Sequence, residues 1–152
     1  MKISRIATVL TVLGTCLVGG AVTATNASAT SYGCDGSLVK TLPIGSIGEA
    51  YVYWDGTYNC AVAVDNAKNA SWITLNLVDC AADTPQIYTS CQMEQAVQDG
   101  YNSSGEPDNS YHWYAGPVNL KAGGHCLYLE ANINVNGENY GYGDNNSTTF
   151  AC

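Results

Sequence analysis

The chain has 152 residues, with five basic and thirteen acidic side chains and a formal net charge of −8. A surface with this acidic excess repels phosphate backbones, which argues against a nucleic-acid partner. The length suits one domain with a single core rather than several domains.

The first 29 residues have the features of an export signal. Lys2 and Arg5 supply a positive start, a largely apolar stretch follows, and Ala27-Ser28-Ala29 offers small residues at the positions that a signal peptidase reads. We therefore expect a signal peptide over residues 1–29 and a single secreted domain over residues 30–152.

Cleavage would leave three basic residues against thirteen acidic ones. Cys16 sits in a lipoprotein-like context, but apolar residues continue beyond it, whereas a lipidated cysteine is normally followed by a polar tether. No second apolar stretch of the sequence approaches the roughly 20 residues that span a bilayer. We therefore expect a secreted, extracellular protein with no membrane association after cleavage.

Several runs rich in β-branched and aromatic residues are bounded by turn residues, which is typical of strands. Residues 49–54 form the first run, closed by the turn dipeptide Asp55-Gly56, and residues 60–65 return as the second arm of a hairpin. A third run, at 71–78, alternates polar with apolar residues apart from Trp72.

The middle of the second half is less uniform. Residues 91–99 fit a short helix or a strand, and residues 100–110 form a polar loop. Residues 111–115 predict a strand, and Gly116-Pro117 is expected to end its pairing because proline lacks the N–H that a sheet needs.

The last predicted strand is long. It covers residues 126–135 and is closed by Asn136-Gly137, a dipeptide favoured in type I′ hairpin turns, before a returning arm at 140–142. Strands at about ten-residue spacing with turn signals between them predict an all-β protein. The expected fold is a small, disulfide-stapled antiparallel β-sandwich or barrel.

Six cysteines lie in the expected mature chain. An even number in a small exported protein indicates a disulfide framework. The spacing alone leaves the pairing open. The six are Cys34, Cys60, Cys80, Cys91, Cys126 and Cys152.

Two segments resemble a known family. Residues 114–118 read Tyr-Ala-Gly-Pro-Val and run on through a glycine-rich stretch to Cys126. Upstream, residues 50–54 form a tyrosine-rich strand and residues 58–62 contain an asparagine-cysteine step. This pattern resembles the spore-associated protein A family of small secreted actinobacterial proteins, over most of the mature chain. The resemblance implies association with the spore or cell exterior, with no established chemistry.

The resemblance also bears on the cysteines. Family members carry four, which match the two outermost positions together with Cys60 and Cys126, so Cys80 and Cys91 are additions that most simply pair with each other. For the other four we favour Cys34–Cys60 and Cys126–Cys152, because each bridge then ties a terminus to the start of a strand. The segment Thr149-Phe150-Ala151-Cys152 departs from the basic-aromatic finish of the family.

Motifs for metal binding are weak. The chain has only two histidines, His112 and His125, and no cysteine pair has the short gap typical of zinc ligands. Residues 132–137 copy the start of a calcium loop, but they lack its leading carboxylates and fit a strand and turn better. We therefore expect no metal site and no cofactor.

Motifs for catalysis are equally weak, and we expect no enzyme. Residues 45–48 miss the spacing of a nucleophile elbow. A Ser-His-Asp triad stays open, because its members meet only in space. Glu49, Glu130 and Glu138 could in principle meet as a carboxylate pair, although solvent-facing strand positions account for them.

Aromatic side chains provide the one hint of a binding surface. Tyr51, Tyr53 and Trp54 fall on one predicted strand, and Tyr111 and Trp113 on another. If these rows face outward, they form a platform that can stack on sugar rings or meet a partner protein. If they face inward, they fill the core, which is the commoner place for large rings.

Three functions follow from these observations. The first is a structural or adhesive protein of the spore or cell surface, with a wall or spore-surface polymer or protein as its partner. The alternative is a carbohydrate- or cell-wall-binding module that uses the aromatic rows. A further alternative is a small secreted hydrolase or protease inhibitor. The sequence leaves the oligomeric state open.

Overall fold

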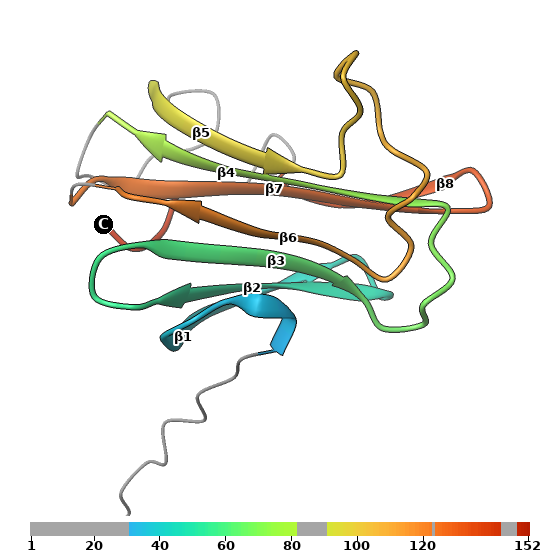
Figure 1. Ribbon diagram of the computed structural model, residues 1–152, viewed down its shortest axis with the longest axis horizontal. Helices are drawn as coiled ribbons and strands as arrows, with labels where there is room; N and C mark the ends of the chain where they lie inside the picture. The colour runs from blue at the N-terminus through green and yellow to red at the C-terminus, as the bar shows by residue number, and fades with distance from the viewer. Residues whose placement is uncertain (1–30, 82–90, 123, 144–148) are drawn as a thin grey trace, which may run out of the picture.

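Two antiparallel four-stranded sheets pack face to face in the computed structural model of the protein (Figure 1). The structure describes residues 31–81, 91–122, 124–143 and 149–152. The expected signal peptide, 1–29, lies outside the described residues. The expected all-β sandwich is confirmed, and the barrel is not, because the strands form two separate sheets. None of the described residues belong to a helix long and apolar enough to cross a membrane.

The first sheet has the strand order β1-β2-β3-β6. Its members are β1 (Ser37–Ile44), β2 (Gly48–Trp54), β3 (Asn59–Asp65) and β6 (Tyr114–Leu120). The second sheet has the order β5-β4-β7-β8. Its members are β4 (Trp72–Cys80), β5 (Met93–Asp99), β7 (Cys126–Val135) and β8 (Glu138–Tyr142). A short 3-10 helix, η1 (Ser31–Gly33), precedes β1.

Both expected hairpin turns are present. Asp55 begins the turn between β2 and β3, and its carboxylate accepts hydrogen bonds from the backbone N–H groups of Thr57 and Tyr58. Asn136 and Gly137 join β7 to β8 with φ values of 52° and 89°. Both values lie in the left-handed region that a type I′ turn requires. Turn chemistry therefore predicted where both hairpins turn.

The expectation that pairing ends at Gly116-Pro117 is wrong. Strand β6 runs through this dipeptide to Leu120, which pairs with Asn59 of β3. Proline is tolerated because β6 is an edge strand, where one N–H is not needed by a neighbour. The expected strand start at Tyr111 is also wrong, because residues 111–113 precede β6.

Two further elements were not assigned from the sequence. Residues 91–99, which fitted a helix or a strand, contain strand β5. Strand β1 was missed because its first five residues are exposed and it contains Pro43, so it lacks the apolar alternation that predicts a strand.

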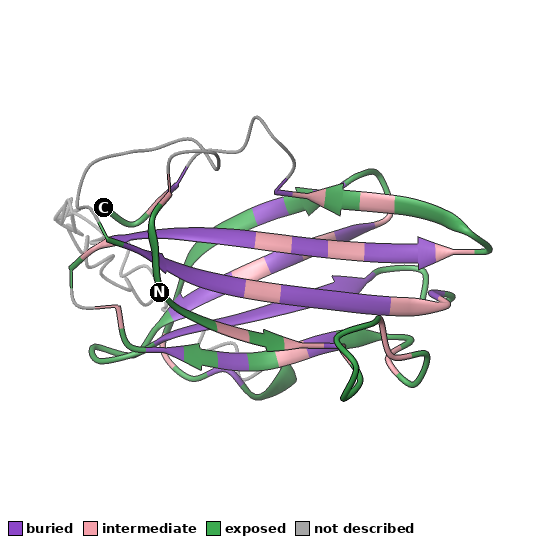
Figure 2. Ribbon diagram, turned by 90° about the horizontal axis from the view of Figure 1, so that it is seen from above, coloured by how far each residue is buried: buried purple, intermediate pink, exposed green. Residues whose placement is uncertain are grey.

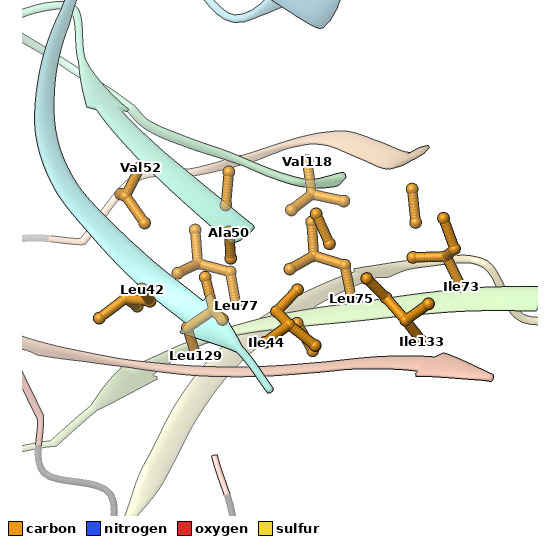
Figure 3. Packing of buried hydrophobic residues seen from close by; sticks show 14 of the residues in the cluster. Leu42, Ile44, Ala50, Val52, Ile73, Leu75, Leu77, Val118, Leu129 and Ile133 are labelled. Atoms are coloured by element: carbon orange, nitrogen blue, oxygen red, sulfur yellow. The ribbon is translucent and has the colours of Figure 1, made fainter. Parts of the chain in front are cut away.

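The core lies between the two sheets and follows the two-residue period of the strands. Leu77 of β4 lies close to Ala50 of β2, and Ile73 of β4 lies beside Ile133 of β7 (Figure 3). Strands β4 and β7 are buried over almost their whole length, as the colours of Figure 2 show. Burial of each large aliphatic side chain contributes about 1.5–3 kcal/mol, so this central pair dominates the packing.

Disulfides reinforce the sandwich at two places. In the described part of the chain they join Cys34 to Cys60, Cys80 to Cys91 and Cys126 to Cys152. This is the pairing that the resemblance and the position of the chain ends favoured. Cys80 and Cys126 are direct partners in the β4–β7 pairing, so the second and third bridges lie side by side at one end of the sandwich.

One buried carboxylate organises the loop between β3 and β4. Asp65 is fully buried, and its Oδ1 accepts a hydrogen bond from the backbone N–H of Ala67 at 2.9 Å. Its Oδ2 accepts from Asn69 at 2.7 Å and from Ala70 at 2.8 Å. One carboxylate thus accepts three backbone hydrogen bonds of the loop, so the side chain takes the place of a regular hydrogen-bond ladder.

We expect Asp65→Ala to lower the free energy of unfolding by about 2–4 kcal/mol, because three backbone donors, including that of the buried Ala70, lose their acceptor. Asp55→Ala is the matched control, since Asp55 caps a turn in the same way but is exposed, and water can replace it. Its expected loss is below about 1 kcal/mol. Urea unfolding measures both variants, and equal losses would contradict the assigned role of Asp65.

Candidate functional site

At one end of the sandwich, at the left in Figure 1, strands β2 and β4 end and β3 begins. The inner rows of both sheets end there. On β2, Trp54 continues at two-residue spacing the inner row that contains Val52. Asn59, the first residue of β3, pairs with Trp54 and therefore shares its face. The first sheet thus contributes an indole and an amide to this end.

The second sheet contributes a carboxylate and an imidazole. On β4, Asp79 continues the inner row that contains Leu77. His125 lies two residues before Leu127, an inner residue at the start of β7. The Nδ1 atom of His125 is 3.2 Å from Oδ1 of Asp79 and 3.4 Å from Oε2 of Glu94. The side chains of Asp79, Glu94 and His125 therefore meet at this end of the sandwich.

A cleft of about 610 Å³, called the end cleft below, is lined by Trp54, Asn59 and His125 among other residues. Its apolar lining includes Val39, Trp54, Ala122 and Phe150, and its polar lining includes Lys40, Asn59 and His125. The Trp54 side chain is 39% exposed, so the indole is available to a ligand. A mainly apolar cleft of this size with a few polar groups is typical of small-molecule sites.

The wall formed by Phe150 depends on the last described segment, residues 149–152. Phe150 and Leu127 exchange two backbone hydrogen bonds, of 2.8 and 2.7 Å. The disulfide between Cys126 and Cys152 ties the same segment to the start of β7. A covalent bond and a short strand pairing therefore fix this side of the cleft.

Tyr51 and Tyr53 do not belong to the end cleft. They lie on the outer face of the first sheet and pack in a separate cluster with the Cys34–Cys60 bridge. Tyr53 is only 3% exposed, so its ring supports the sheet rather than offering a surface. The expectation that these rings share one face is confirmed, but that face is largely covered.

Tyr111 and Trp113 lie at the opposite end of the sandwich, before β6. The Tyr111 hydroxyl donates a hydrogen bond to Asp99 at 2.8 Å, which raises the pKa of Tyr111. Trp113 is 60% exposed, and the Nζ atom of Lys68 lies 5.7 Å from its ring centroid. The five aromatic residues are therefore divided among three places and do not form the outward platform that was one of the two alternatives. The other alternative, a buried position, applies to Tyr53.

The described residues do not assemble the catalytic triad that the sequence left open. Nδ1 of His112 is 2.8 Å from the backbone oxygen of Ala70. His125 contacts two carboxylates. In this part of the chain neither imidazole is hydrogen-bonded to a serine hydroxyl, so the geometry adds nothing to the hydrolase alternative.

Trp54 was predictable from the sequence, whereas the charged part of the site was not. Asp79, Glu94 and His125 are far apart in the chain, and no short ligand motif connects them. One signal was present: Asp79 occupies an apolar position in the alternation of residues 71–78 when that run is extended by one residue. A charged residue at such a position predicts a partner or a ligand.

Comparisons of the chain with models of protein families, with curated proteins and with solved structures gave no match. The fold and the geometry of the end cleft are therefore the observations from which a function is inferred.

Tyr51, on the covered outer face of the first sheet, has a raised pKa. The Tyr51 hydroxyl donates a hydrogen bond to the carboxylate of Glu49, its neighbour on the same strand. This bond, together with burial and the repulsion between a phenolate and the Glu49 charge, raises the pKa of Tyr51 from 10.0 to about 12. The protonated phenol is the form that stabilises the fold.

Because the folded-state pKa is raised, this contribution is complete below pH 10 and is lost as the pH rises toward about 12. We expect Tyr51→Phe to remove a late-ionising group from the phenolate absorbance titration. Glu49→Gln keeps an acceptor without the charge and should return the pKa of Tyr51 toward 10.0. A titration that neither variant changes would contradict the assignment.

Proposed function

We propose that the protein is a secreted, non-catalytic adhesive module of a cell or spore surface, and that its end cleft binds a saccharide unit of a surface polymer. The observation that carries this proposal is the exposed indole of Trp54 in a cleft of about 610 Å³. The three disulfides are compatible with an extracellular location.

The composition of the end cleft suits a sugar better than a purely apolar ligand. The face of an indole stacks on the apolar face of a sugar ring, while nearby polar groups bind its hydroxyls. Lys40, Asn59 and His125 provide such groups beside Trp54. Asn59 is 7% exposed and its amide offers both a donor and an acceptor. The lining therefore combines a stacking surface with hydrogen-bonding groups of both kinds.

The surface location rests on two supports of different kinds. The export features of residues 1–29 favour secretion. The resemblance to the spore-associated protein A family favours the spore or cell exterior. A purely structural role on that surface is the second candidate, and it differs from the first because it needs no ligand in the end cleft.

A pull-down on purified, insoluble peptidoglycan tests the saccharide proposal. We expect the mature protein to be retained and Trp54→Ala to bind about tenfold more weakly, a loss of about 1.4 kcal/mol, because the stacking surface is removed. Trp113→Ala is the matched control: it removes an exposed indole at the other end of the sandwich and should leave retention unchanged.

Thermal unfolding of both variants checks that the sandwich remains intact. Trp54→Phe keeps an aromatic ring in the cleft and should restore most of the binding. Failure of the parent protein to bind peptidoglycan and other wall polysaccharides would overturn the proposal in favour of the purely structural role. Equal losses in Trp54→Ala and Trp113→Ala would place the binding surface outside the end cleft.

A further inference from the structure

Three ligand-type atoms converge beside the end cleft. They belong to Asp79, Glu94 and His125, and one donor atom of each lies within 4.8 Å of the other two. The closest printed contacts are those of His125 Nδ1 with Oδ1 of Asp79 and with Oε2 of Glu94. In the part of the chain that the structure describes, no other group of three or more histidine, cysteine or acidic side chains brings its donor atoms this close. The group therefore differs from the scattered carboxylates of the remaining surface.

Burial makes this group costly unless something binds to it. The Asp79 side chain is only 1% exposed. Its Oδ1 atom is buried without a hydrogen-bond partner among the described residues, and so is Nδ1 of His125. The two atoms are 3.2 Å apart, within ion-pair distance, and they form no hydrogen bond with each other. A buried carboxylate oxygen without a hydrogen bond is unfavourable, so a ligand for both atoms would remove the penalty.

A different feature of the backbone positions each of Asp79, Glu94 and His125. Asp79 follows the inner row of β4. Glu94 is the extra residue of a bulge, because Asp79 pairs with Gln95 and Cys80 pairs with Met93. Such a bulge changes the direction of a side chain relative to regular pairing. His125 immediately precedes Cys126, whose disulfide fixes the start of β7.

We propose that Asp79, Glu94 and His125 bind one divalent transition-metal ion of the Zn²⁺ class. One imidazole nitrogen and two carboxylate oxygens suit Zn²⁺, whereas Ca²⁺ and Mg²⁺ prefer oxygen ligands alone. Two carboxylates also balance the charge of a divalent ion at a partly buried site.

The distances fit this coordination. Metal–ligand bonds of about 2.0–2.1 Å in a tetrahedron place neighbouring ligand atoms about 3.3–3.4 Å apart. The His125 nitrogen lies 3.2 Å from the Asp79 oxygen and 3.4 Å from the Glu94 oxygen. Three protein ligands leave the fourth position to solvent or to another ligand, as in zinc sites that stay open.

The metal site stands apart from the saccharide proposal. Asp79 and Glu94 do not line the end cleft, and only His125 belongs to both. The competing explanation is a histidine that pairs with two carboxylates and binds no ion. The two explanations differ in whether the protein takes up Zn²⁺.

Calorimetric titration of the chelator-treated mature protein with Zn²⁺ distinguishes them. We expect one ion per chain, and at least about 100-fold weaker binding of Ca²⁺, because its ligand preference is different. Glu94→Gln should weaken Zn²⁺ binding at least about tenfold, and His125→Ala should abolish it. Glu94 is 47% exposed, so its substitution does not disturb the core.

His112→Ala and Glu106→Gln are the matched controls, because they remove the other histidine and an exposed carboxylate outside the group. Both should bind Zn²⁺ like the parent. Zn²⁺ should also raise the unfolding temperature of the parent but not of His125→Ala. Absence of saturable Zn²⁺ binding by the parent, or binding that Glu94→Gln and His125→Ala leave unchanged, would overturn the proposal. Trp54→Ala should keep Zn²⁺ binding, so failure of either proposal can be recognised separately.

Discussion

The unbroken antiparallel pairing of β4 with β7 is the constraint on which the rest of the structure depends. It runs from Trp72 opposite Asn134 to Cys80 opposite Cys126 without a register shift. Because a shift of one residue would turn every side chain to the other face, this regular pairing carries the alternation to the very end of both strands. The inner row of β4 consequently ends in Asp79, and His125 extends the inner row of β7.

The same pairing explains why two disulfides lie beside the candidate site. Its last pair, Cys80 and Cys126, consists of two cysteines that each bond to a different segment. One bridge holds Cys91, just before β5 and its bulge, and the other holds the segment that contains Phe150. Neighbouring strands and loops would otherwise fray at this open end. The bridges therefore hold the walls of the end cleft and the position of Glu94 in place before any ligand binds.

The sequence was informative where local chemistry decides the structure. Asn136-Gly137 has one favourable turn geometry, so its hairpin was predictable from two residues. The structure was not predictable from the sequence where pairing with neighbouring strands determines it. Gly116-Pro117 is compatible with a strand only because β6 lies at an edge. The bulge at Glu94 depends on how β5 pairs with β4, which no pattern in the chain reveals. The two aromatic rows do not form one platform for a related reason, since residues 111–113 belong to a connection and not to a strand.

At the end of the inner rows, the residues present are not those that would best stabilise the fold. A well-packed apolar residue in place of Asp79 would be expected to hold the two sheets together at least as well, because replacing buried polar partners with apolar residues of similar volume is often neutral or stabilising. Similarly, Trp54 is a large ring that remains partly exposed where Val52 and Ala50 are fully buried. Two departures from the pattern of the core therefore coincide at one end of the sandwich, and that end is the one fixed by two disulfides. Departures that packing does not require are expected at functional sites, and this coincidence is the physical reason to assign binding to the end cleft and to the three ligand-type groups beside it.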